Sequence, residues 1–193
     1  TLVAVAALRW PDVQALLVSR PPITSVEIER RNGVLTGTVL ARFGDDPTLR
    51  TFLSLPPEAG ILNGAALVDV DGRGDQLVVL CPAKPIQGAT LVAYDREARE
   101  RWSLDLLPSW KWPDEVVSPY WHCLSVTKAD LNQVPGDELI VSANAYGSYP
   151  SGVSLISPHP QSAQIVRTFW HPGNVSSAVV VPASTHETVE LLA

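Results

Sequence analysis

The chain has 193 residues, 46% of them apolar and 18% charged, and this balance is typical of a folded protein and argues against disorder. Its formal charge is −6, and its lysine and arginine residues form no cluster, so a nucleic-acid groove and an anionic membrane surface are poor partners. No segment reaches the roughly 18 consecutive apolar residues of a membrane span, and the N-terminus lacks the basic region of a signal peptide.

Short strands punctuated by turn residues are expected from the N-terminus onward. Residues 1–42 predict a first four-stranded unit, in which Asn32-Gly33 is a two-residue hairpin signal. Residues 43–63 carry two proline-containing stretches and are expected to form a linker. The strands of the first unit are expected at residues 2–8, 13–19, 24–29 and 35–41.

A second unit is predicted over residues 64–106 and a third over residues 122–172, separated by a linker at 107–121. A partial unit follows at 173–193, with strands expected at 178–183 and 188–193. In the second unit the strands are expected at residues 65–70, 76–81, 89–94 and 100–106. In the third unit they are expected at residues 122–128, 138–143, 152–157 and 164–170.

The units recur at a regular spacing. Ala15, Leu77 and Leu139 occupy matching positions 62 residues apart, and Leu191 follows after 52. Regular groups of four short strands predict an all-β fold, namely a β-propeller of four-stranded antiparallel blades, with about three blades plus the start of a fourth. Closed rings use about 4–8 blades, so we expect a fragment of a longer protein, or a ring completed by another copy of the chain.

One turn carries a family resemblance. Residues 69–79, Asp-Val-Asp-Gly-Arg-Gly-Asp-Gln-Leu-Val-Val, resemble the FG-GAP/VCBS repeat of integrin-α-type propellers, whose core is an Asp-x-Asp-Gly-x-Gly turn before an apolar strand. Residues 130–141 form a looser second copy, whereas the first and last units lack the acidic turn. The resemblance implies a propeller and an extracytoplasmic or cell-surface location.

In that family the acidic turn often binds Ca²⁺ through oxygen ligands at alternating positions. The resemblance therefore implies one ion on Asp69, Asp71 and Asp75, and a weaker site on Asp130, Asn132 and Asp137. Arg73 and Val134 stand where the third ligand of each copy belongs. The alternative is a metal-free Asx turn, in which the carboxylates accept hydrogen bonds from backbone amides.

Aromatic residues are concentrated in the linker after the second unit and in one loop of the third unit. In an up-and-down blade, the loop after the second strand and the linker after the fourth lie on the face opposite the acidic turns. We predict a surface there that binds a protein or a glycan, with packing between blades as the alternative. Its residues are Trp110, Trp112, Tyr120 and Trp121 of the linker, with Tyr146 and Tyr149 of the third unit.

The function predicted from these patterns is binding without catalysis. The sequence carries no nucleophile elbow, phosphate-binding loop or HExxH motif. We expect an interaction or sensor module within a larger protein; the alternatives are a lectin-like, carbohydrate-binding propeller and a segment of a propeller enzyme such as a polysaccharide lyase. For Cys81 and Cys123 we expect two buried thiols, with a single bridge as the alternative.

Overall fold

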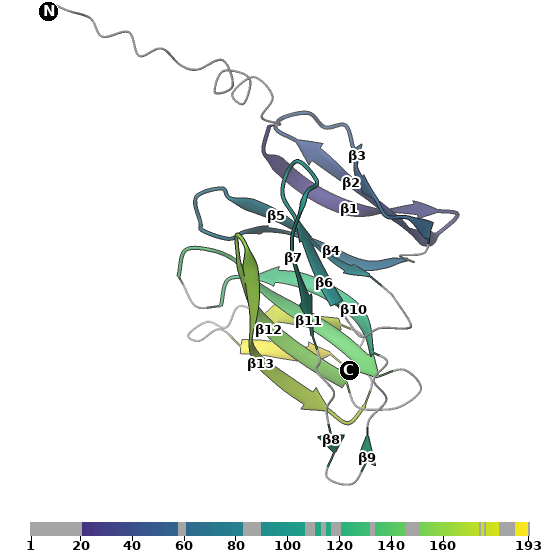
Figure 1. Cartoon of the computed structure of the whole chain (residues 1–193), viewed down its shortest axis with the longest axis vertical. Coiled ribbons are helices and arrows are strands. Elements are labelled where there is room, and N and C mark those ends of the chain that lie inside the picture. Colours follow the sequence, from purple (N-terminus) through teal and green to yellow (C-terminus); the bar gives the residue numbers. More distant parts are fainter. Residues whose placement is uncertain are drawn as a thin grey trace, which may run out of the picture.

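The structure is a computed structural model, and it confirms the all-β prediction. Within the part of the chain that it describes there is no α-helix, and antiparallel sheets of three and four strands dominate (Figure 1). None of the described residues belongs to a helix long and apolar enough to cross a membrane. The described residues are 21–57, 61–82, 90–106, 111–112, 115–116, 121–131, 134–145, 151–173, 175, 177–181 and 188–192.

The first sheet has the order β1-β2-β3, formed by β1 (Ile23–Arg31), β2 (Val34–Phe43) and β3 (Arg50–Ser54). Asn32 and Gly33 join β1 to β2 with φ values of 53° and 80°, as a tight hairpin turn of the predicted kind requires. The two strands expected at 24–29 and 35–41 are thereby confirmed, while those at 2–8 and 13–19 lie outside the described residues.

Two expectations about this region are wrong. Residues 43–63 contain β3 and the start of the next sheet, and are not simply a linker. As a result β2, expected at the edge of its unit, lies between β1 and β3. The proline-rich flanks obscured β3, which is held to β2 by pairing and by the burial of Phe52 against the core.

The second and third sheets match the predicted strands closely. The second has the order β4-β5-β6-β7 and the third the order β10-β11-β12-β13. Their strands are β4 (Leu62–Asp69), β5 (Gln76–Pro82), β6 (Thr90–Tyr94), β7 (Glu100–Asp105), β10 (Trp121–Ala129), β11 (Glu138–Ala145), β12 (Ser151–His159) and β13 (Ser162–His171). Both sheets are antiparallel meanders, as expected of four-stranded blades.

Two hairpins complete the described strands. The partial fourth unit is a pair, β14 (Ser177–Val181) and β15 (Thr188–Leu192), as predicted. The segment 107–121, expected as a linker, also contains the short strands β8 (Lys111–Trp112) and β9 (Glu115–Val116), which pair with each other.

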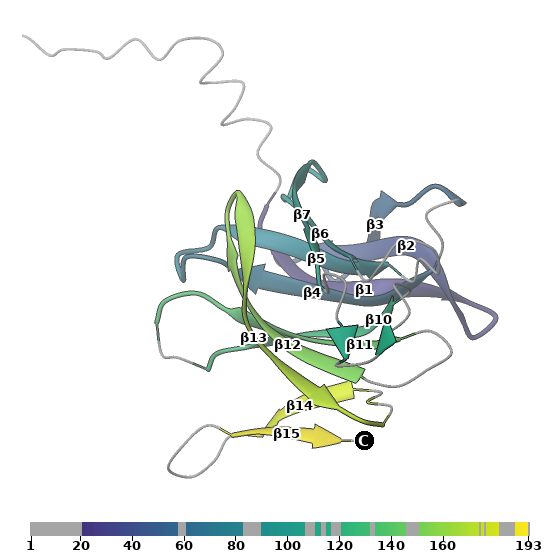
Figure 2. The same cartoon turned by 60° about the horizontal axis from the view of Figure 1, so that its bottom comes forward.

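The sheets are packed face to face in chain order. The first strands of successive sheets, β1, β4, β10 and β14, contact one another in series (Figure 2). Three apolar cores lie between neighbouring sheets. In β5, Leu77 and Val79 face the third sheet, whereas Val78 and Leu80 face the first. A strand buried on both faces is therefore apolar at consecutive positions. The sheets formed by the described residues do not close into a ring.

A disulfide bond joins the second and third sheets, so the expectation of two free thiols is wrong. Cys81 of β5 is bonded to Cys123 of β10, with their Cα atoms 5.8 Å apart. Gly64 of β4 makes this approach feasible, because a Cβ atom there would lie 3.0 Å from the Val126 nitrogen. Asn63 adds a hydrogen bond, since its Nδ2 donates to the Cys123 carbonyl at 2.6 Å.

Candidate functional site

The two acidic turns lie together at one end of the second and third sheets. The first turn leaves β4 at Asp69, and the second precedes β11. Asp137 links them twice: its backbone N–H donates to the Asp69 carbonyl at 2.7 Å, and its Oδ2 accepts from the Asp69 N–H at 2.7 Å. The prediction that the acidic turns share one end is confirmed for these residues.

Within the first turn, carboxylates accept hydrogen bonds from the backbone. Asp69 accepts from the N–H groups of Asp71 and Gly74, at 3.3 and 3.0 Å. Asp71 Oδ1 accepts from the N–H groups of Arg73 and Asp75, at 2.8 and 3.2 Å. These two amides hold the pKa of the Asp71 carboxyl below its usual range. This is the geometry of the Asx-turn alternative.

Glycine is required where the two turns touch. Gly72 has φ 68°, and a Cβ atom there would lie 2.8 Å from Pro135 Cβ. Gly136 has φ 118°, and a Cβ atom there would lie 2.8 Å from the Val70 carbonyl oxygen. The turns therefore fit against each other only because both positions lack a side chain.

In the second turn, the structure describes two of the three expected ligands, Asp130 and Asp137. Asp137 is also paired with Lys128, whose Nζ lies 3.3 Å from Oδ2. Asn132 lies outside the described residues. Asp69, Asp130 and Asp137 border a hollow of about 330 Å³ between the turns.

A calcium ion requires six to eight oxygen ligands, and the described residues of the two turns do not fit that requirement. Both carboxylate oxygens of Asp69 already accept amide hydrogens, and Asp137 faces the Lys128 ammonium. Asp69 borders the hollow between the turns, whereas Asp71 and Asp75 border a neighbouring one. The predicted set Asp69, Asp71 and Asp75 is therefore divided between these two hollows.

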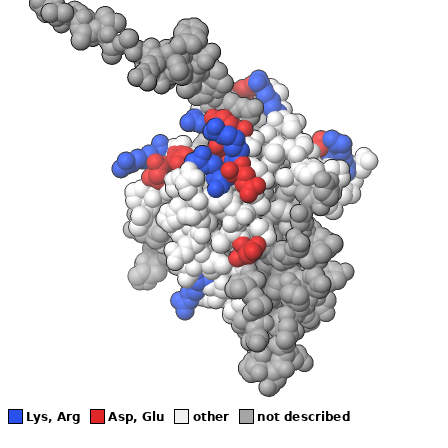
Figure 3. All heavy atoms as spheres, in the orientation of Figure 1, with Lys and Arg blue, Asp and Glu red and all other residues white. Residues whose placement is uncertain are grey.

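The neighbouring hollow is rich in charge of both signs. It has a volume of about 430 Å³ and lies between the β4–β5 and β6–β7 turns of the second sheet. Figure 3 shows acidic and basic side chains gathered in this part of the molecule. At its base, Asp95 is only 8% exposed and accepts from Arg99 Nε at 2.8 Å and from Arg101 at 3.4 Å. The other charged groups that line it are Asp71, Arg73, Asp75, Arg96 and Glu97.

Asp95 makes the stability of the second sheet depend on pH. Burial acts to raise its pKa, but hydrogen bonds from the Arg99 amide and guanidinium outweigh burial and lower the pKa below its ordinary value of 3.8. A carboxyl with a lowered pKa in the folded state stabilises it above about pH 4 and loses that contribution as the pH falls through the folded pKa.

We therefore expect Asp95→Asn to lower the melting temperature at pH 7 and to reduce its fall between about pH 4 and pH 2. Melting curves across that range measure both effects. Asp45→Asn, in an exposed turn, is the control. Parallel pH profiles for wild type and Asp95→Asn would contradict the assigned role.

The predicted aromatic residues connect to the opposite end of the third sheet. Trp121 begins β10 and is paired with Ala145, the last residue of β11, directly before the loop that carries the two tyrosines. Trp121, the last residue of the expected linker, and Ala145, which precedes the tyrosine segment, are thus paired at one end of the sheet. Trp112 and Trp121 lie in strands, but their side chains are outside what the structure describes, as are residues Trp110, Tyr120, Tyr146 and Tyr149.

Two aromatic residues that the sequence analysis missed lie at the same end. Phe169 and Trp170 are 45% and 37% exposed near the end of β13. Trp170 is paired with Gly152, and its ring lies over that glycine. The Arg167 guanidinium lies 5.1 Å from the centre of the Phe169 ring. Two adjacent aromatic residues near the end of the last strand of the third unit were the sequence feature that could have revealed them.

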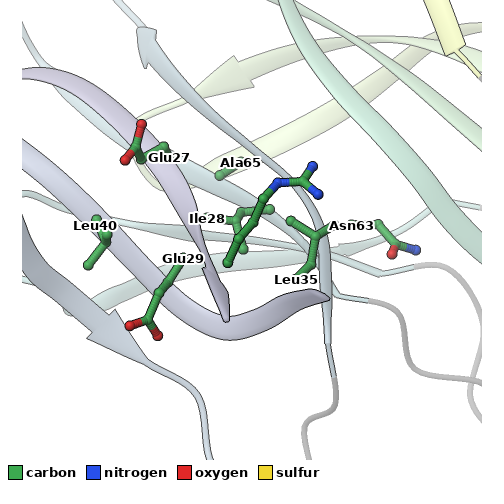
Figure 4. A pocket seen from close by; sticks show the side chains of 8 residues that line it. Glu27, Ile28, Glu29, Leu35, Leu40, Asn63 and Ala65 are labelled. Carbon is green, nitrogen blue, oxygen red and sulfur yellow. The ribbon is translucent and has the colours of Figure 1, made fainter. Parts of the chain in front are cut away.

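A further cavity that no motif predicted lies between the first sheet and β4. It has a volume of about 560 Å³. Figure 4 shows Asn63 on one side of it and Glu27 and Glu29 on the other. Glu29 is already engaged by Thr36 and Arg31. The remaining lining residues are Ile28, Arg30, Leu35, Leu40 and Ala65.

Comparison with known proteins identifies no relative: no family model, no curated protein and no solved structure matches this chain.

Proposed function

We propose that the protein is a non-catalytic binding module that recognises its partner at the aromatic end of the third sheet. The observation that carries the proposal is the exposure of Phe169 and Trp170 at the end of the sheet where Trp121 pairs with Ala145. Exposed aromatic residues held on a strand provide contact area with little loss of conformational entropy. The six aromatic residues of the linker and loop would extend the same surface.

The wider architecture supports presentation of this surface by a rigid scaffold. We propose that the sheets are consecutive propeller blades of the FG-GAP/VCBS type, because their first strands contact one another in series and matching strands recur after 62 residues. The disulfide supports folding in an oxidising, extracytoplasmic compartment, where such bonds persist. The remaining blades would come from the same longer chain or from a second copy.

The partner is a protein or a glycan, and the two are separable by experiment. Screening the protein against a glycan array and against a displayed peptide library identifies which class it binds. Selective retention of glycans would favour the lectin alternative, and selective retention of peptides the interaction module. Turnover of a polysaccharide retained on the array would contradict a non-catalytic role.

Trp110→Ala, Trp112→Ala and Phe169→Ala are expected to weaken binding to the retained glycan or peptide and to leave the fold intact. Losing an aromatic anchor costs about 2 kcal/mol, or roughly thirtyfold in affinity. Titration and thermal melting of the same variants measure the two effects, with Val34→Ala, an exposed apolar residue of the first sheet, as control.

The alternative of aromatic residues packed between blades predicts the reverse outcome. Emptying a buried tryptophan site costs about 3–5 kcal/mol of stability. A large fall in melting temperature for Trp110→Ala and Trp112→Ala, with unchanged affinity, would therefore place these two rings in the core and remove them from the surface.

A further inference from the structure

The acidic turns have a feature that neither the family resemblance nor the binding proposal uses. They are separated by more than 60 residues in the sequence, yet the Asp137 N–H donates to the Asp69 carbonyl and the Asp69 N–H donates to the Asp137 carboxylate. One of these bonds is charge-assisted, because a carboxylate oxygen accepts it at 2.7 Å. The two turns approach closely enough for these bonds because Gly72 and Gly136 have no side chains.

We infer that the Asp137 carboxylate joins the two acidic turns directly, without a metal ion, and that this clasp couples the second sheet to the third. Donors within the protein bond to the carboxylates of Asp69 and Asp137. Backbone amides bond to Asp69, and both the Asp69 amide and the Lys128 ammonium bond to Asp137. A divalent cation would have to compete with these donors and would face the Lys128 ammonium.

The clasp and the disulfide hold the same two sheets at opposite ends of their first strands. Asp69 ends β4, whereas Asn63 and Gly64, beside the disulfide, lie at its start. On β10, Cys123 lies near the start, and the second acidic turn follows the strand's end. Two attachments at opposite ends prevent the second and third sheets from shifting along each other or separating at one end. The two sheets are therefore expected to unfold together.

The test compares substitutions at Asp137 with a matched control in the same region. Asp137→Ala removes the acceptor and leaves the Asp69 amide without its partner, so the melting temperature should fall by about 4–8 °C. Asp137→Asn keeps an acceptor oxygen but loses the charge, so its fall should be smaller. Asp75→Asn, at an exposed position in the first turn, should change the melting temperature by less than about 2 °C.

Hydrogen exchange and calcium titration complete the test. In the wild type the amides of Asp69 and Asp137 should exchange as slowly as those of the neighbouring strands, and in Asp137→Asn they should exchange faster. Hydrogen exchange in the wild type and in Asp137→Asn tests the inference even if Asp137→Ala does not fold. Millimolar calcium chloride should leave the wild-type melting temperature unchanged.

Two results would overturn the inference. One is equal stability of Asp137→Ala and Asp75→Asn with fast exchange at both amides, which would mean that no clasp exists. The other is a calcium-induced rise in the wild-type melting temperature that Asp137→Asn abolishes, because the turns would then hold a metal. Neither result bears on partner binding at the aromatic end.

Discussion

Replacing both Cys81 and Cys123 with alanine is expected to cost about 4 kcal/mol of stability. The bond closes a loop of 42 residues, and the entropy that such a cross-link removes from the unfolded chain corresponds to that figure. Both cysteines are fully buried, and alanine introduces no polar group in their place. For a chain of this size the melting temperature should fall by about 8–16 °C.

Reduced wild-type protein is the matched comparison for the disulfide. Unfolding and refolding in reductant, with both thiols left unmodified, yields a chain that lacks only the bond. It should melt near the alanine variant, and protein unfolded with an alkylating agent but without reductant should show no alkylated thiol by intact mass. A native protein with two alkylatable thiols after unfolding without reductant would contradict the bond.

Val78→Asp is expected to abolish cooperative folding of the first and second sheets. Val78 is fully buried on the face of β5 that packs against the first sheet. An unpaired carboxylate at that position has no partner and loses its hydration, which costs several kcal/mol and exceeds typical point substitutions. Because native domains are stable by only about 5–15 kcal/mol, most of the available stability would be lost.

The control for Val78→Asp is Val166→Asp on the outer strand β13. Val166 is 57% exposed, so a carboxylate there remains hydrated, and the change in stability should stay within about 0.5 kcal/mol. Far-UV circular dichroism during thermal melting distinguishes the two variants. A soluble Val78→Asp protein with an unchanged transition would refute the burial of this strand between two sheets.

The sequence by itself determined the strands of the second and third sheets. Residues 77–81 are all apolar, residues 139–141 are also consecutively apolar, and turn residues precede both runs, which is typical of strands buried on both faces. Asn32-Gly33 and the acidic turns marked the places where the chain reverses. These signals are local, since turn geometry and strand preference depend on residues within a few positions of each other.

The sequence also predicted which turns share an end, because strands of a meander alternate in direction. The acidic turns do meet, and Trp121, the last residue of the expected linker, pairs with Ala145 at the end of β11. The calcium assignment drew on resemblance alone. The Asx-turn alternative anticipated the backbone amides that bond to Asp69 and Asp71, whereas the Lys128 ammonium beside Asp137 was not foreseen.

Only the tertiary structure decided the features that join one sheet to the next. The disulfide spans 42 residues, the Asn63 hydrogen bond to Cys123 spans 60, and the Asp69 bond to Asp137 spans 68. No residue type reveals such a partner in advance, because the contact depends on how closely two sheets approach. In β3, likewise, pairing with β2 and burial of Phe52 outweighed the proline-rich flanks. Long-range packing selects among pairings that local sequence permits equally.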